Sequence, residues 1–224
     1  MRRTSAAGVR FHALEVVTRD VSKGSLPNTV EVGKWLVAPV QLALAQSLTG
    51  LNRNDAVAVL DNAIHRGAIR VSDIPWLQRA MSGRPGATKA LPWLALADGR
   101  SESPLETSAR LDCIDGGVAP DYLQLEFKNS NGRVVARVDL AWDLPGGKYL
   151  VLEVDGASIH SEPDALFRDR ERSNVLQSAG VVILRVTARD LYSQGRVAGL
   201  VKQALARHGR QLPVHQAQVI RKAA

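Results

Sequence analysis

The sequence predicts an α/β fold in which a mixed β-sheet is flanked by helices. Between residues 101 and 208, patterns typical of helix, strand, strand, strand, helix, strand and helix follow one another. The most apolar of these strands, residues 181–186, is typical of a sheet that is covered on both faces. A hydrophobic content of 45% in 224 residues is sufficient for a substantial core.

The front of the chain predicts a small sheet followed by short helices. Strand patterns occupy residues 14–19, 29–32 and 35–37. Helical patterns cover residues 40–48 after Pro39, residues 55–66 with Asn54 as N-cap and Gly67 as stop, and a short stretch from Ile74 to Met81 capped by Ser72 or Asp73. None of these helices combines a basic face with base-reading side chains, so we expect a scaffold rather than a helix-turn-helix reader.

Residues 82–87 have the composition of a linker, and the remaining elements follow in order. Helices are predicted over residues 88–97, from Ser103, over residues 163–179 and over residues 188–208. Strands are predicted over residues 122–127, 134–140, 149–152 and 181–186. We therefore predict an N-terminal segment over residues 1–86, an α/β domain over residues 87–208 and a basic tail over residues 209–224.

Three carboxylates are expected to meet at one end of the predicted sheet. Glu153 and Asp155 alternate on the strand that ends there, so they project from the same face. Pro145-Gly146-Gly147 supplies turn chemistry for a hairpin that would bring Asp139 beside them. Clustered carboxylates repel one another and favour a hard cation with oxygen ligands, so the pattern indicates a Mg²⁺ or Mn²⁺ site. The alternative is that these are ordinary strand-end residues and that Asp155-Gly156 only begins a turn.

A family resemblance favours the metal site. The residues that carry it are Asp139, Glu153-Val-Asp155-Gly156, His160, Asp169, Arg172, Leu176, Gly180 and Leu184-Arg185-Val186, preceded by Ser103-Pro104-Leu105-Glu106 and Arg110. This order resembles the endonuclease-like domain related to very-short-patch repair endonucleases, in the PD-(D/E)XK restriction-endonuclease-like superfamily. The match covers residues 101–206. The segment before it resembles the region that precedes such domains in actinobacterial abortive-infection antitoxin-type proteins, whose winged helix would lie upstream.

The resemblance implies roles for individual residues. Asp139, Glu153 and Asp155 would hold the metal, and Glu106 would lie near it. The catalytic lysine of the superfamily is Asp155 in this chain, and the repair endonucleases, which also lack it, use a histidine placed like His160. Glu106 and Arg110 are spaced to form a helical ion pair, which on the surface has little value. His160 has the alternative of being a surface histidine.

The charge distribution favours a polyanionic partner. Residues 1–100 carry 13 basic and 7 acidic side chains, residues 101–191 carry 10 and 15, and residues 192–224 carry 6 and none. An acidic centre between basic flanks suits an enzyme that acts on DNA, although a net charge of +7 also aids solubility. Three side chains on one predicted helix, Arg168, Arg170 and Arg172, could contact phosphates, or could simply be solvated.

Composition limits the other possibilities. The single Cys113 excludes an internal disulfide, and its helical neighbours Leu111 and Ile114 predict that it is buried. No apolar run reaches the length of a membrane span, so we expect a cytoplasmic protein without a membrane partner. The sequence thus predicts a metal-dependent endodeoxyribonuclease. Its alternative is a catalytically inactive nuclease-like fold that binds DNA, or a protein partner in toxin–antitoxin or phage-defence biology.

Overall fold

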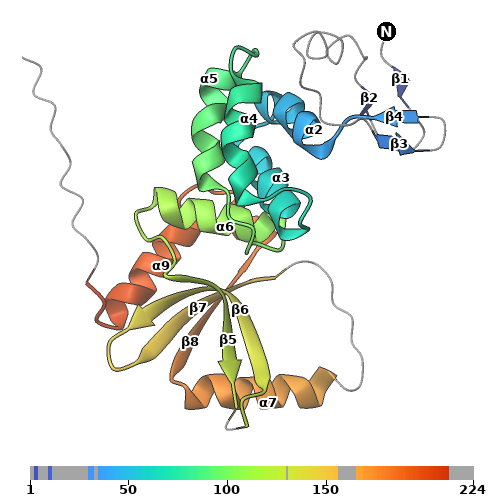
Figure 1. The fold of residues 1–224 in the computed structure, drawn as a ribbon. Helices are drawn as coiled ribbons and strands as arrows, with labels where there is room; N and C mark the ends of the chain where they lie inside the picture. Colours follow the sequence, from blue (N-terminus) through green and yellow to red (C-terminus); the bar gives the residue numbers. More distant parts are fainter. Residues whose placement is uncertain are drawn as a thin grey trace, which may run out of the picture. The chain divides into compact units, whose positions relative to one another are not determined.

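The computed structural model describes residues 3–4, 10–11, 30–32, 35–129, 131–155 and 165–211. The predicted strand at residues 14–19, His160 and the tail from residue 212 lie outside these residues. The chain divides into two compact units (Figure 1). The N-terminal unit comprises Met1–Gly50 and Ala68–Leu91, and the sheet unit comprises Leu51–Gly67 and Pro92–Ala224.

The N-terminal unit contains two short antiparallel ladders and a group of small helices. Strand β1 (Arg3–Thr4) pairs with β2 (Arg10–Phe11), and β3 (Val30–Val32) pairs with β4 (Trp35–Val37). The helical elements are α2 (Val40–Ser47), η1 (Leu48–Gly50), η2 (Val71–Asp73), α4 (Ile74–Met81) and α5 (Ala87–Ala90). Leu42, Leu48, Leu77 and Met81 are buried within this unit. Short amphipathic helices of this kind are stable only through such packing.

Two predicted helices differ in the structure. The helix expected over residues 88–97 is α5 followed by the 3₁₀ helix η3 (Leu91–Leu96), because Pro92 has no N–H to continue an α-helical ladder. The helix expected from residue 55 is α3 (Arg53–His65), and its N-cap is Asn52 rather than Asn54. The side chain of Asn52 accepts a hydrogen bond from Asp55 N at 3.0 Å. Helix α3 belongs to the sheet unit, so the predicted boundary at residue 86 does not separate the two units.

The sheet unit is built on a four-stranded mixed sheet in the order β5, β6, β7, β8 (Figure 1). The strands are β5 (Tyr122–Lys128), β6 (Val134–Leu144), β7 (Lys148–Asp155) and β8 (Val181–Thr187). Neighbouring strands from β5 to β7 are antiparallel, whereas β8 is parallel to β7. The predicted hairpin is confirmed, with Leu140 opposite Leu152. The prediction of a mixed α/β sheet is therefore correct.

Helices cover both faces of this sheet and create two hydrophobic clusters. Helices α6 (Pro104–Asp115) and α9 (Arg196–Arg207) lie on one face, where Trp142 and Leu152 are fully buried. Helix α7 (Ala165–Ser178) lies on the other face, where Leu176 packs with Val151 (Figure 1). The indole N–H of Trp142 donates to the carbonyl oxygens of residues 118 and 119, each at 3.0 Å, so burial leaves this group satisfied. Cys113 is buried in the first cluster, as predicted, and burial raises the pKa of its thiol to about 12.

The C-terminal part of the sheet unit differs from its prediction in two ways. The helix expected over residues 188–208 is interrupted after α8 (Ala188–Leu191), and α9 begins after Gly195, whose φ of +79° favours glycine. Asp112 of α6 accepts hydrogen bonds from the backbone N–H groups of Gly195 (2.6 Å) and Ala198 (2.9 Å). Strand β8 is an edge strand with Ile183 36% exposed, so it is not covered on both faces.

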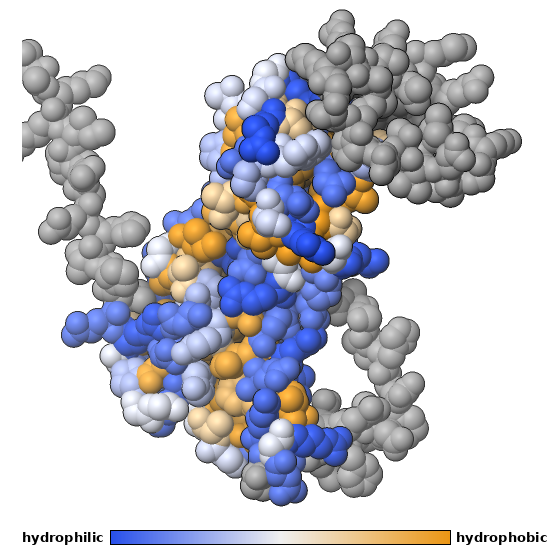
Figure 2. Space-filling model, viewed as in Figure 1, coloured by the Kyte–Doolittle hydropathy of each residue, from blue (hydrophilic) through white to orange (hydrophobic). Residues whose placement is uncertain are grey.

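The visible surface of the sheet unit is largely hydrophilic, with smaller hydrophobic patches between the polar side chains (Figure 2). The large hydrophobic residues that remain exposed on this unit include Tyr122, Val134 and Ile183. Scattered exposure of this kind is normal for a folded domain. Within the described part of the chain, no helix has the length and apolar content needed to cross a bilayer.

Candidate functional site

Strand β6 changes faces at Asp139, and this irregularity creates the site. Val138 packs in the cluster beneath α7, whereas Leu140 packs in the cluster beneath α6 and α9. A regular strand would place both on one face. In the described sheet Asp139 has no ladder partner, because β6 pairs with β7 only from Leu140 onward and the ladder with β5 passes from Val138 to Leu140. Its carboxylate Oδ2 instead accepts a hydrogen bond from Val154 N at 2.8 Å.

Strand β5 is also irregular, at the position beside Asp139. Gln124 of β5 has φ = +54° and is the one non-glycine residue in the left-handed region among those the structure describes. The ladder between β5 and β6 skips it, passing from Leu123–Leu140 to Leu125–Val138. Its side-chain Nε2 donates to Oε2 of Glu106 at 2.8 Å. A strained residue of this type is a reason to suspect function, and here it holds the Glu106 carboxylate on α6.

Glu106, Asp139 and Glu153 lie close enough to interact electrostatically. Burial raises the pKa of Asp139 to about 6, and repulsion from Glu106 and Glu153 adds to this effect. The N–H of Val154 and the charge of Arg172 act in the opposite direction. The three carboxylates come from α6, β6 and β7, so the sheet unit brings together three of the residues that the sequence predicted for the site.

Glu153 is 8% exposed and is neutralised by arginines from two other elements. Nη2 of Arg172 on α7 donates to its Oε1. Nε of Arg185 on β8 donates to its Oε2 at 3.2 Å, and Arg185 stands opposite Glu153 in the parallel ladder. Arg172, expected to contact phosphate, therefore binds a carboxylate in this arrangement. Arg185 could have been identified from sequence, because it is the single charge in the apolar run of residues 181–186.

Among the remaining predicted site residues, Asp155 alone has a side chain that the structure describes. Asp155 is exposed at the end of β7, opposite Thr187 in the ladder. His160 and the side chains of Arg168 and Arg170 lie outside the described residues. Within the described ranges, no three His, Cys, Asp or Glu side chains are placed to hold a metal ion.

The side chains at this site are nevertheless of the chemical type that binds a hard cation. Carboxylate oxygens are the ligands that Mg²⁺ and Mn²⁺ prefer, and Asp139 and Glu153 supply them next to each other. Repulsion among the three carboxylates would be relieved by a cation. Each oxygen of Glu153, however, accepts a hydrogen bond from a guanidinium. A cation at Glu153 would lie beside two guanidinium groups, and their mutual repulsion would favour the exchange of an arginine for the metal.

The expected ion pair between Glu106 and Arg110 is not formed. The guanidinium of Arg110 instead pairs with Asp61 of α3, with Nη2 and Oδ2 2.7 Å apart. Its Nε donates to Ser101 Oγ at 3.2 Å and its Nη1 to Leu96 O at 2.9 Å. The pairing was missed because Asp61 is distant in sequence and lies in a pattern typical of a solvent-exposed helix. This group is structural and leaves Glu106 free to face Gln124.

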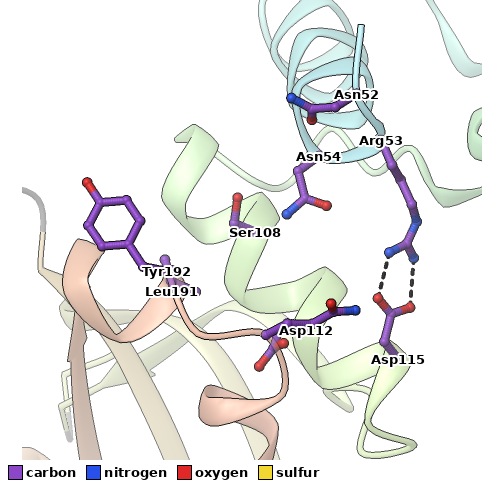
Figure 3. A pocket seen from close by; sticks show the side chains of 9 residues that line it. Asn52, Arg53, Asn54, Ser108, Asp112, Asp115, Leu191 and Tyr192 are labelled. Atoms are coloured by element: carbon purple, nitrogen blue, oxygen red, sulfur yellow. Dashed lines mark hydrogen bonds and ion pairs between the residues drawn. The ribbon is translucent and has the colours of Figure 1, made fainter.

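A pocket of about 360 Å³ lies beside the C-terminal end of α6 (Figure 3). Its lining residues are Asn52, Arg53, Asn54, Ser108, Asp112, Asp115, Leu191, Tyr192 and Gln194. Arg53 and Asp115 form a bidentate pair across it, with distances of 2.6 and 2.8 Å. Asp112 is engaged with the N-terminus of α9. The charged groups of this pocket are thus satisfied within the protein, and we place the candidate site at Asp139 and Glu153.

Comparison with known proteins identifies relatives but no activity. The chain is similar to two proteins of Mycobacterium tuberculosis that are described as uncharacterized, one in strain CDC 1551 and one in strain H37Rv. Each is 32% identical over 176 residues, which make up 78% of this chain and 63% of the relative. The chain thus spans less than two thirds of the length of these relatives. No protein-family model matches the chain, and no solved structure matches it significantly.

Proposed function

We propose that the sheet unit is a metal-dependent endodeoxyribonuclease with a restriction-endonuclease-like fold. The observation that carries the proposal is the group of Glu106, Asp139 and Glu153, three carboxylates from three elements, in which burial, with added repulsion from Glu106 and Glu153, raises the pKa of Asp139 to about 6. Carboxylates with strongly shifted pKa values cluster at functional sites. The resemblance to very-short-patch repair endonucleases covers the same residues. The reaction would take place in the cytoplasm, with DNA as the substrate.

The residues have distinct roles in this proposal. Asp139 and Glu153 would hold Mg²⁺ or Mn²⁺, and Gln124 would keep the Glu106 carboxylate at the site through their hydrogen bond. The cation supplies Lewis-acid chemistry, since it polarises the phosphodiester and makes a nearby water more acidic. His160 would orient the attacking water or accept its proton. Asp155 stands where the superfamily has lysine, and its exposure leaves it free to contact water or the cation.

A second candidate is a nuclease-like fold that binds DNA or a partner protein without cleaving DNA. The observation that favours it is the pairing of both Glu153 oxygens with arginines, together with the missing lysine. A carboxylate neutralised in this way resembles a structural ion-pair group. In this case the basic residues would serve binding alone, in a toxin–antitoxin or phage-defence setting.

Plasmid cleavage separates the two candidates. Purified protein is incubated with supercoiled plasmid in Mg²⁺, in Mn²⁺ and in EDTA, with Asp139→Asn as the matched variant. The nuclease proposal expects metal-dependent nicking that disappears in the variant while DNA binding persists. DNA binding without nicking in either metal would support the second candidate. Because basic groups supply the attraction, DNA affinity should fall steeply with salt for both candidates.

A further inference from the structure

Two guanidinium groups share one carboxylate at the centre of the site. Arg172 and Arg185 reach Glu153 from α7 and β8, and each donates to a different oxygen. These three side chains alone carry a net charge of +1, and the neighbouring carboxylates of Asp139 and Glu106 offset it. The Arg185 side chain is 66% exposed and that of Arg172 is 35% exposed, whereas that of Glu153 is only 10% exposed. The arginine side chains are therefore more exposed than the carboxylate that they share.

An arginine in this position can exchange partners at small cost. A buried carboxylate needs a paired charge, and Glu153 keeps one whenever either an arginine or a cation remains on it. Guanidinium groups bind phosphate oxygens with two parallel N–H donors, and their weak hydration eases the transfer from one anion to another. The solvent-exposed part of Arg185 is already accessible to a phosphate.

We propose that Arg172 and Arg185 form a phosphate-binding pair that is held on Glu153 in the free protein and moves to a DNA backbone phosphate when DNA binds. The transfer releases the Glu153 carboxylate, which then joins Asp139 in binding the cation. DNA and the cation therefore bind with positive coupling. This inference rests on the proposed metal-dependent nuclease function and specifies how its site is assembled.

Thermodynamic linkage gives the proposal a measurable form. If a DNA duplex tightens Mn²⁺ binding by a given factor, Mn²⁺ must tighten DNA binding by the same factor. We expect a factor of about 10, within the range usual for coupled sites. Removing one arginine has an unusual consequence, because the DNA-free protein should then bind Mn²⁺ more tightly than the parent does. A guanidinium that stays in place also repels the cation, so its removal too would tighten Mn²⁺ binding. The fall of the coupling factor toward one is therefore the result that marks the transfer, and a parental coupling factor would contradict it.

The experiment is a Mn²⁺ titration, monitored by the electron paramagnetic resonance of free Mn²⁺, of the full chain with and without a non-cleavable phosphorothioate duplex. The test variant is Arg185→Gln, because the exposed Arg185 can be replaced without disturbing the core, and Arg172→Gln provides a second test. Both should bind Mn²⁺ several-fold more tightly than the parent without DNA, and their coupling factor should fall toward one. Their DNA affinity in EDTA should be lower than that of the parent.

The matched control is Arg53→Gln. Arg53 belongs to the same unit and pairs at 2.6 Å with Asp115, which lies at the opposite end of α6 from Glu106. This variant loses the same charge and should keep the coupling factor of the parent. Parental or weaker Mn²⁺ affinity in both Arg185→Gln and Arg172→Gln would overturn the arginine transfer while leaving the nuclease proposal intact. If the parent binds no Mn²⁺ with or without duplex, the nuclease proposal fails as well.

Discussion

The guanidinium of Arg110 lies 2.7 Å from the carboxylate of Asp61, 49 residues earlier in the chain, and both side chains are almost completely buried. Asp61 also accepts hydrogen bonds from Thr107 Oγ1 at 2.7 Å and from Asp98 N at 2.6 Å. These contacts join α3 to α6. They explain why α3 belongs to the sheet unit although the chain between them, residues 68–91, belongs to the other.

Breaking this buried pair should be costly. Arg110→Ala leaves the Asp61 carboxylate, whose pKa burial already raises, without its counter-ion. We expect a loss of about 3–5 kcal/mol in the free energy of unfolding. Urea denaturation measures it. Arg53→Ala, which breaks the exposed pair with Asp115, is the control and should cost less than about 1 kcal/mol. Equal losses in the two variants would contradict a structural role for the buried pair.

The raised pKa of Asp139 predicts how stability depends on pH. Its folded-state value of about 6 exceeds the ordinary value of 3.8, so ionisation is opposed in the folded protein. The resulting penalty is absent below pH 3.8, grows as the pH rises from 3.8 to 6, and is complete above that. Asp139→Asn removes the penalty and can still accept a hydrogen bond from Val154 N.

In EDTA, we expect the Asp139→Asn variant to match the parent near pH 4 and to exceed it at pH 7. The gain should be on the order of 1 kcal/mol, because solvent screens a group that is only partly buried. Thermal melts across this pH range measure it. Added Mn²⁺ should stabilise the parent more than the variant. A variant that is less stable than the parent at pH 7 in EDTA would argue that Asp139 is a structural acceptor.

Gln124 offers a test of stored backbone strain. In an ordinary strand, glycine is less stable than alanine by about 0.5–1 kcal/mol. At φ = +54° the order should reverse, because alanine retains the Cβ clash of the left-handed region and glycine does not. We expect Gln124→Gly to be more stable than Gln124→Ala by about 1 kcal/mol in urea denaturation. Both variants lose the hydrogen bond to Glu106, so the comparison isolates the backbone.

His160→Ala should reduce DNA cleavage by about 10²–10⁴-fold if the imidazole transfers a proton during the reaction. Circular dichroism should show an unchanged fold. His65→Ala is the control, because His65 Nδ1 lies 3.2 Å from Gly99 O and has no role in the proposed chemistry, so its loss should leave the cleavage rate unaltered. An unaltered rate in His160→Ala would indicate a surface histidine without a catalytic role.

The parts of the fold that were predictable depend on local chemistry. Pro145-Gly146-Gly147 specifies the hairpin, and the hairpin brings Asp139 close to Glu153. The helix predicted from Ser103 is α6, and Ser103 is its N-cap, accepting a hydrogen bond from Glu106 N at 3.2 Å. The break between α8 and α9 was not predicted, because the apolar periodicity of the sequence continues through it. In the structure, the N–H of Gly195 at this break donates to Asp112, a residue of another helix.

The candidate site was predictable in its residue types and less so in its contacts. The change of faces at Asp139 requires both neighbouring strands, so alternation along one strand could not reveal it. Gln124 carries no sequence signal, since glutamine in the left-handed region is uncommon and its role arises from the backbone. The arginine pairing of Glu153 depends on how α7 and β8 lie beside β7, which is a property of the tertiary structure.

The hydrogen bonds from α9 to Asp112 also bear on the order of folding during synthesis. Helix α9 has 12 residues, which is marginal for an isolated helix, and its first N–H groups find their acceptor 83 to 86 residues upstream. A peptide of residues 196–207 should therefore be mostly unstructured in water. On the ribosome, the strands and α6 emerge before α9, so the part of this sheet face that α9 covers stays exposed until residue 207 has left the exit tunnel. During this interval α6 alone covers the cluster around Trp142.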